Sequence, residues 1–255
     1  MSVKPKWTRP SGPLNVWKVV DGYETLNDGT KKPVKFSIQD VPNDEKRRQE
    51  VLQLMYTHFL AEEPCSKSLK IKDTDPDGVQ DFLTLWKYSL DQGVVIACYK
   101  LDSNGKIENL VGANIIFMKT PETLQDFNQM KQFFKSSNFL TIWDTFEDLA
   151  SRADVCKTYN VDRYITSISL SILPAFRGQK LGLHILDARS PMAKKYGFSA
   201  TTTFFTAQAS QIQAKRAGFE EGVSVEFADI LDDKGNPKFP NIDSKYAKIM
   251  MKRLP

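Results

Sequence analysis

The sequence predicts an α/β protein in which helices cover a mixed sheet, and three observations support this prediction. Apolar runs of strand length alternate along the chain with segments whose apolar residues recur at helical spacing. Two apolar runs, 94–99 and 110–118, flank the polar turn 102–106, which is typical of adjacent antiparallel strands. An apolar strand over 165–172 leads through a basic, glycine-containing turn into a helix. The expected element order is β-α-α-β-β-α-β-α-β-α-β-β.

The first elements are predicted from turn and strand signals. Residues 1–13 are polar and proline-rich, and we expect an irregular tail there, followed by one domain over residues 14–255. Residues 16–26 predict a hairpin, because the Asp-Gly dipeptide at 21–22 favours a tight turn between apolar runs. Alternating apolar residues over 34–38 indicate a half-buried strand.

Two helices are expected before the antiparallel strand pair. Asn43 is the expected N-cap of the first, whose apolar residues fall at helical spacing up to Leu60. Pro64 prevents the continuation of this helix. The second spans about residues 78–90 and carries its apolar residues on one face.

The C-terminal elements are predicted in the same way. A long helical region is expected over 122–153, before the strand at 165. The later elements are a helix to about 195 that Ser190-Pro191 interrupts, a strand over 199–206, a helix over 210–216 that Gly218 closes, and strands over 223–231 and 246–252.

Cysteine and histidine usage disfavours several classes of site. Three widely spaced cysteines, Cys65, Cys98 and Cys156, predict neither a disulfide framework nor a thiolate zinc site, and they fit a reducing compartment. His58 and His184 have no metal-ligand spacing, so no histidine metal site and no Ser-His-Asp triad is expected.

Charge and hydropathy predict a soluble, cytoplasmic protein. The formal net charge of +4 comes from short scattered basic runs, so we expect no nucleic-acid partner, although a mild positive bias attracts an anionic cofactor. The N-terminus has no apolar leader and no stretch reaches the ~20 apolar residues of a membrane helix, so no membrane partner is expected. Nothing in the sequence indicates the oligomeric state.

The turn between residues 173 and 186 is the strongest functional signal. Free N–H groups at the start of a helix, together with the helix dipole, favour an anion such as a diphosphate. Arg177 adds a charge-assisted fork, and Gly178 and Gly182 let a ligand approach the backbone. The same residues also fit an ordinary strand-to-helix turn with a surface arginine, because short glycine patterns recur by chance.

The spacing of Arg177 and Gly182 resembles the acetyl-CoA signature of the GCN5-related N-acetyltransferases, Arg/Gln-x-x-Gly-x-Gly/Ala. Lys180 stands in place of the middle glycine. Because L-residues disfavour positive φ, we expect a turn conformation that such a residue tolerates.

Two further segments resemble the insect arylalkylamine N-acetyltransferases. Glu63 and Pro64 fall on an Asp-Glu-Pro-Leu motif whose glutamate is the catalytic base, and Thr206 and Ser210 fall on two serine positions four apart. The resemblance spans residues 36–252, with departures at Lys180, Cys65 and Pro191.

The resemblance implies the acyl-CoA N-acyltransferase fold, with a central mixed, mostly antiparallel sheet flanked by helices. It implies acetyl-CoA as acyl donor and coenzyme A as product, with main-chain N–H groups near residues 170–173 as oxyanion donors. The residues that it implies for the cofactor are Leu170, Ser171, Ile172, Leu173, Arg177, Gly178, Gln179, Lys180, Leu181, Gly182 and Ser210.

The resemblance also implies catalytic roles. Glu63 would take the amine proton through one or two waters, since an alkylammonium near lysine's ~10.4 is protonated at neutral pH. Ser210, with Thr206 nearby, would donate or relay a proton to the leaving thiolate. The residues alone leave other roles open: Glu63 as a solvated helix-end carboxylate beside the competing Glu62, Thr206 as a packed strand residue, and Ser210 as the N-cap of a helix from Gln211.

We therefore expect direct transfer from acetyl-CoA to a small, arylalkylamine-like primary amine in a ternary complex. Cys65 has no histidine beside it in sequence, so no covalent acyl-enzyme is needed. The alternatives are a catalytically silent acyl-CoA-binding module, a polyamine or agmatine acetyltransferase, and a protein acetyltransferase. The residues expected beside the acceptor are Tyr56, Phe59, Trp143, Phe205 and Phe227.

Overall fold

The structure is a computed structural model that describes residues 3–255, and these residues form one eight-stranded sheet. The strand order is β1-β2-β3-β4-β5-β6-β8-β7, and every neighbouring pair is antiparallel except β5 and β6. The expected mixed, mostly antiparallel sheet is confirmed. The strands are β1 (Val16–Thr25), β2 (Lys31–Asp40), β3 (Ile96–Leu101), β4 (Ile107–Lys119), β5 (Tyr164–Ile172), β6 (Ala200–Phe205), β7 (Glu220–Glu226) and β8 (Tyr246–Arg253).

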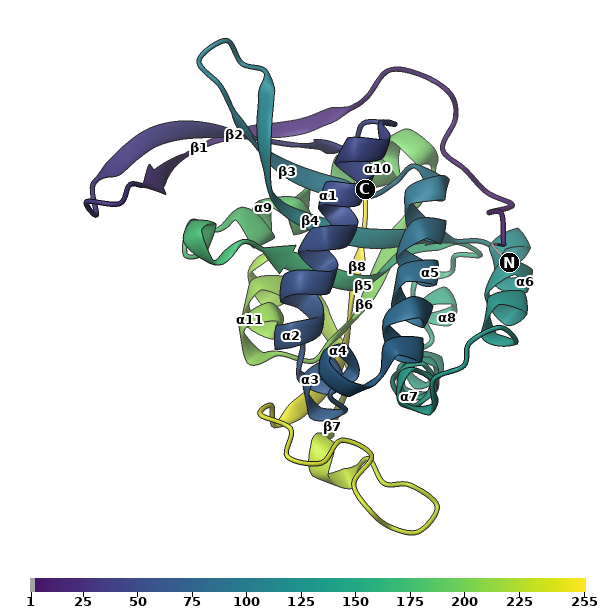
Figure 1. The fold of residues 1–255 in the computed structure, drawn as a ribbon. Helices are drawn as coiled ribbons and strands as arrows, with labels where there is room; N and C mark the ends of the chain where they lie inside the picture. Colours follow the sequence, from purple (N-terminus) through teal and green to yellow (C-terminus); the bar gives the residue numbers. More distant parts are fainter. Residues whose placement is uncertain (1–2) are drawn as a thin grey trace.

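Helices cover both faces of this sheet (Figure 1). The first helices and α5 pack on one face, and α9 and α10 pack on the other. Among residues 3–255, no helix is long and apolar enough to cross a membrane. The α-helices are α1 (Glu45–Leu54), α2 (Leu60–Glu62), α3 (Pro64–Ser68), α4 (Ile71–Thr74), α5 (Pro76–Gln92), α6 (Pro121–Lys131), α7 (Ser137–Ala153), α8 (Val155–Tyr159), α9 (Leu181–Asp187), α10 (Arg189–Tyr196) and α11 (Gln208–Arg216).

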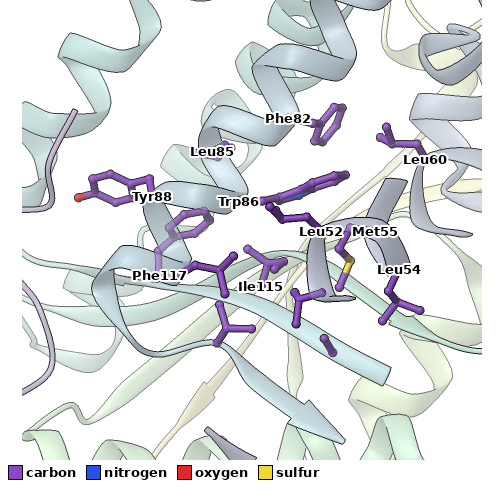
Figure 2. Close-up of a cluster of buried hydrophobic side chains, with 14 of the residues drawn as sticks. Leu52, Leu54, Met55, Leu60, Phe82, Leu85, Trp86, Tyr88, Ile115 and Phe117 are labelled. Atoms are coloured by element: carbon purple, nitrogen blue, oxygen red, sulfur yellow. The ribbon is translucent and has the colours of Figure 1, made fainter. Parts of the chain in front are cut away.

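The largest buried cluster lies between α1, α5 and the middle of the sheet (Figure 2). Trp86 of α5, Met55 and Ile115 of β4 are all fully buried in it. The indole of Trp86 also donates a hydrogen bond of 3.0 Å to the hydroxyl of Ser169 on β5. This core fixes the central strands against the helices that precede Glu63.

The N-terminal hairpin differs from the expected one. Residues 16–25 form a single strand, β1, that pairs with β2, and the chain reverses at 26–30 instead of at Asp-Gly. The role of Gly22 is close approach, because a Cβ there would lie 2.6 Å from the Phe36 ring and 2.7 Å from the Gln179 side-chain oxygen. That oxygen accepts a 2.7 Å hydrogen bond from the N–H of Tyr23, so β1 contacts the turn after β5.

The first helix has a different N-cap from the one expected and contains a π-helical turn. Asp44, not Asn43, is the N-cap, because its carboxylate accepts the N–H of Lys46. After α1 the chain forms a π-helical turn over Met55–Phe59 before α2. As expected from Pro64, the helix stops, and this proline begins α3.

The helical region after β4 and the helix after the basic turn are each divided in the structure. Ser136 caps a new helix, so the region 122–153 is divided into α6 and α7, and α8 follows where no helix was expected. The helix after the basic turn is interrupted, as expected, but the break is at Ala188; Pro191 lies in the first turn of α10.

Replacing Gly22 by alanine is expected to lower the free energy of unfolding by about 1–3 kcal/mol, because the new methyl group meets the buried Phe36 ring. Urea denaturation followed by circular dichroism measures this change. Gly12→Ala is the control, since a Cβ at Gly12 meets nothing within 4 Å, and it should change stability by less than about 0.5 kcal/mol. Equal stability of the two variants would contradict the role assigned to Gly22.

Candidate active site

A cavity of about 460 Å³ lies where β5 and β6 separate. The two strands pair only over 165–167 and 201–203, and residues 168–172 and 203–207 line the cavity beyond that point. The edge of β5 that faces β6 therefore has no strand partner over 168–172, and the main-chain groups there that are not bonded to a side chain are available to a ligand. Leu173 does not line the cavity, because its N–H donates to the Val111 carbonyl at 2.8 Å.

The basic turn forms one end of the cavity. Gly178 has φ +81°, and a Cβ there would meet nothing within 4 Å. Lys180 has φ +62°, which lies in the small left-handed region that L-residues can adopt. The lysine adopts the left-handed conformation that a glycine takes easily, at a cost of about 1–2 kcal/mol. Gln179 does not line the cavity, since its side chain bonds to β1.

Arg177 and Glu62 form an ion pair at the cavity mouth. The Nη2 atom of Arg177 lies 2.6 Å from Oε2 of Glu62, and its Nε donates to the Ile172 carbonyl at 2.9 Å. Both side chains are about half exposed, so the pair is worth about 0–1 kcal/mol and an incoming anion can displace it. The two adjacent glutamates thus have different surroundings, Glu62 at the mouth and Glu63 inside.

The Glu-Pro step turns the side chain of Glu63 into the cavity. A residue before proline avoids the helical region, and Glu63 has an extended ψ of 126° that ends α2 and starts α3. Its Oε1 accepts the N–H of Cys65 at 3.1 Å and the Thr206 hydroxyl at 2.6 Å. Its Oε2 accepts the N–H and the hydroxyl of Ser66, both at 2.7 Å. Each carboxylate oxygen therefore has two donors.

Thr206 and Ser210 also line the cavity. Thr206 directly follows β6, and its hydroxyl is the only group of the described residues outside 65–66 that donates to the Glu63 carboxylate. Ser210 lies inside α11 and donates to the Ala207 carbonyl at 2.7 Å, so it is not the N-cap that the residues alone left open.

Comparisons with known proteins give a consistent assignment. No protein-family model matches the chain, and no curated protein matches it by sequence. Among solved structures, one named insect putative arylalkylamine N-acetyltransferase 7, from the yellow fever mosquito Aedes aegypti, is 26% identical with a TM-score of 0.83, over 98% of this chain and 100% of that one.

The chain has the fold of the GCN5-related N-acetyltransferases and resembles the insect arylalkylamine N-acetyltransferases. Two further structures share its fold at lower identity. Arylalkylamine N-acetyltransferase 2 of Aedes aegypti is 20% identical with a TM-score of 0.72, over 87% and 99% of the two chains. The Drosophila melanogaster polyamine N-acetyltransferase, which forms N-acetylagmatine, is 16% identical with a TM-score of 0.70, over 86% and 100%.

Much of the cavity wall of this acetyltransferase is aromatic. Of the five residues expected beside the acceptor, Phe59, Trp143 and Phe205 line the cavity. Tyr56 does not, because it points outward beside Lys72. Phe227 does not either, because it packs on Phe239 in a separate core. The apolar lining residues that the sequence analysis did not identify include Phe82, Leu85, Phe139, Ile142, Phe146 and Phe204.

The helix α7 carries several of these missed residues. The sequence predicts the helix and places Trp143 beside the acceptor, but periodicity does not distinguish a core face from a cavity wall, so the other lining residues of α7 were not identified. The missed residue with the most unusual surroundings is Arg189 of α10, which is fully buried and lines the cavity. An arginine at the centre of an otherwise apolar helical face is the signal that could have found it.

The acetyltransferase has no reactive cysteine at its candidate base. Cys65 is fully buried, and burial, followed by the charge of Glu63, raises the pKa of its thiol well above the ordinary value. His58 lies 3.8 Å from Glu62 and forms no hydrogen bond with Cys65. This arrangement disfavours a cysteine acyl-enzyme.

Iodoacetamide is expected to label the native protein at Cys156 alone, since Cys65 and Cys98 are buried. Labelling should speed up as the pH rises, because burial, with the nearby Asp154, raises the pKa of Cys156. Peptide mass spectrometry after a short exposure at two pH values measures this, and the urea-unfolded chain is the control that labels all three cysteines. Native labelling at Cys65 would be the contrary result.

Proposed function

We propose that this protein transfers an acetyl group from acetyl-CoA to a small, arylalkylamine-like primary amine, with Glu63 as general base. The observation that carries the proposal is that one cavity joins three parts: the basic turn, the Glu63–Thr206 pair and an aromatic wall. Acyl transfer from a thioester to an amine needs these three parts in one place.

The residues around the turn fit the donor. Gly178 leaves open space at the backbone, a Cβ at Gly182 would only touch the Leu170 side chain at 3.7 Å, and Arg177 and Lys180 supply positive charge for a diphosphate. The unpartnered edge of β5, at Leu170, Ser171 and Ile172, offers main-chain groups to an extended amide arm. When bound, acetyl-CoA supplies an acyl group activated as a thioester.

The proton leaves the amine through Thr206. Because both oxygens of Glu63 already accept two hydrogen bonds, its roughly four lone-pair sites are occupied. The Thr206 hydroxyl keeps lone pairs that can accept from the amine while it donates to Glu63. This path replaces the expected chain of waters with a side chain. Ser210 donates its single hydroxyl proton to the Ala207 carbonyl, so it does not serve as the acid. We propose that it contacts the cofactor instead.

The lining favours an aromatic acceptor over a polyamine. A second cationic end needs an acidic partner, and the only carboxylates among the described residues that line the cavity are Glu62 and Glu63. Glu63 serves the reacting amine, and Glu62 is paired with Arg177. Phe59, Trp143 and the aromatic residues of α5 and α7 instead offer apolar faces to a ring.

Two alternatives are less well supported. A catalytically silent acyl-CoA-binding module has no need for the Glu63–Thr206 pair. A protein acetyltransferase needs an open groove for a peptide, whereas α7 contributes four residues, from Phe139 to Phe146, to the wall of the cavity.

Thiol release from acetyl-CoA across a panel of amines tests the proposal. We expect saturable turnover with arylalkylamines such as tyramine, dopamine and serotonin, and weaker turnover with agmatine, putrescine, spermidine and amino acids. Glu63→Gln should lower kcat by about 10²–10⁴-fold with little change in coenzyme A affinity. Glu62→Gln is the matched control and should retain kcat. No turnover with any amine, together with coenzyme A binding, would favour the silent module.

Thr206→Val is expected to reduce kcat by about 10²-fold or more, because it removes the hydroxyl between the amine and Glu63 and keeps the side-chain shape. Thr206→Ser keeps the hydroxyl and should retain most of the activity. Steady-state kinetics with the best amine measures both variants. If valine and serine variants had similar kcat values, the proton would not pass through this hydroxyl.

A further inference from the structure

The structure holds a buried cation that the proposed mechanism does not use. Arg189 is 1% exposed, lies at the start of α10 and lines the cavity. Its Nη1 donates to the hydroxyls of Thr201 at 3.0 Å and Thr203 at 2.8 Å, and its Nη2 donates to Oδ1 of Asn114 at 2.8 Å. All three partners are neutral.

No charge in the described part of the chain compensates this guanidinium. Burial alone lowers the pKa of Arg189 to about 9, with no contribution from a carboxylate, so the group is still charged at neutral pH. Its Nε–H is buried without a hydrogen-bond partner, although Phe219 lies beneath the plane at 5.6 Å. Burying a charge without a partner of opposite charge costs free energy. A fully buried guanidinium that lines a cavity therefore points to an anion bound in that cavity.

The Arg189 side chain lies at the point where β5 and β6 separate. Thr203 is the last residue of β6 that pairs with β5, and its partner is Ser167. Asn114, which Arg189 holds, donates to the Ser167 hydroxyl at 2.6 Å and to the carbonyl of Ser169 at 2.7 Å, just beyond the separation. The guanidinium therefore lies at the inner end of the opening between the two strands.

We propose that Arg189 binds the sulfur of coenzyme A and stabilises it as the thiolate. This inference rests on the proposed function. In the transfer, the bond from the amine nitrogen to the acyl carbon forms, the carbon–sulfur bond breaks and its electron pair stays on sulfur. The amine proton goes to Glu63 through Thr206. Because the electron pair stays on the sulfur, a nearby cation stabilises it and a proton donor is not needed. Ser210 does not donate to the sulfur, because its hydroxyl donates to the Ala207 carbonyl.

The other charged groups of the cavity do not serve this purpose. Arg177 and Lys180 belong to the turn, and Glu62 and His58 lie at the mouth. Glu63 is negative and would raise the pKa of a nearby thiol. Arg189 is the one cation among the described lining residues that is fully buried.

The test is the pKa of the coenzyme A thiol when bound, read from thiolate absorbance as a difference against the complex with desulfo-coenzyme A. We expect it to be lower than in free coenzyme A by about one to three pH units, the effect of a nearby opposite charge. Arg189→Met should return the thiol pKa to its free value and lower kcat more than it changes the KM for acetyl-CoA. Arg189→Lys should partly restore both.

The control is Lys119→Met, which removes a largely buried cation that pairs with Glu147 outside the cavity and should leave the thiol pKa low. If Arg189→Met does not fold, Arg189→Gln replaces it as an uncharged variant. An unshifted thiol pKa in the bound wild type, or an equally low one in the uncharged variants, would overturn the inference while the proposed function stands. Absence of coenzyme A binding would overturn both.

Discussion

The separation of one parallel strand pair determines the rest of this site. β5 and β6 share three residue pairs and then part, with the buried network of Arg189 and Asn114 at the inner end. Because the sheet is open there, a single cavity passes from the face covered by α9 and α10 to the face covered by α5 and α7. A donor held at the turn and an acceptor held against aromatic rings can therefore meet within the sheet, away from water.

The second constraint is the peptide bond between Glu63 and Pro64. The proline ring forces the glutamate out of the helical conformation and makes it the cap of the next helix. Four hydrogen bonds then fix the carboxylate, three from residues 65–66 and one from Thr206. Local backbone geometry thus positions the base, and only the Thr206 contact depends on the tertiary fold.

The same contrast between local geometry and tertiary contacts explains which parts of the site the sequence predicts. Local sequence patterns mark the turn at Arg177, the helix end at the Glu-Pro step, and the strand-to-helix segment that holds Thr206 and Ser210. The sequence therefore predicts these three elements. The Asp-Gly dipeptide in β1 was misread because glycine serves both in turns and at close contacts, and only the contact between Gly22 and Phe36 distinguishes them. Arg189 was missed because its partners lie 12 to 75 residues away. The lining residues of α7 other than Trp143 were missed because a core face and a cavity wall have the same periodicity.

The π-helical turn over Met55–Phe59 has an evolutionary consequence. Such a turn accommodates one inserted residue within a helix, so the flanking segments keep their places while the side chains within the turn change direction. His58 and Phe59, which belong to this turn, line the cavity, whereas Glu63 follows it. Gain or loss of a single residue here would reshape the acceptor wall and leave the base where it is. Substrate preference among relatives could thus diverge by insertion and deletion as well as by substitution.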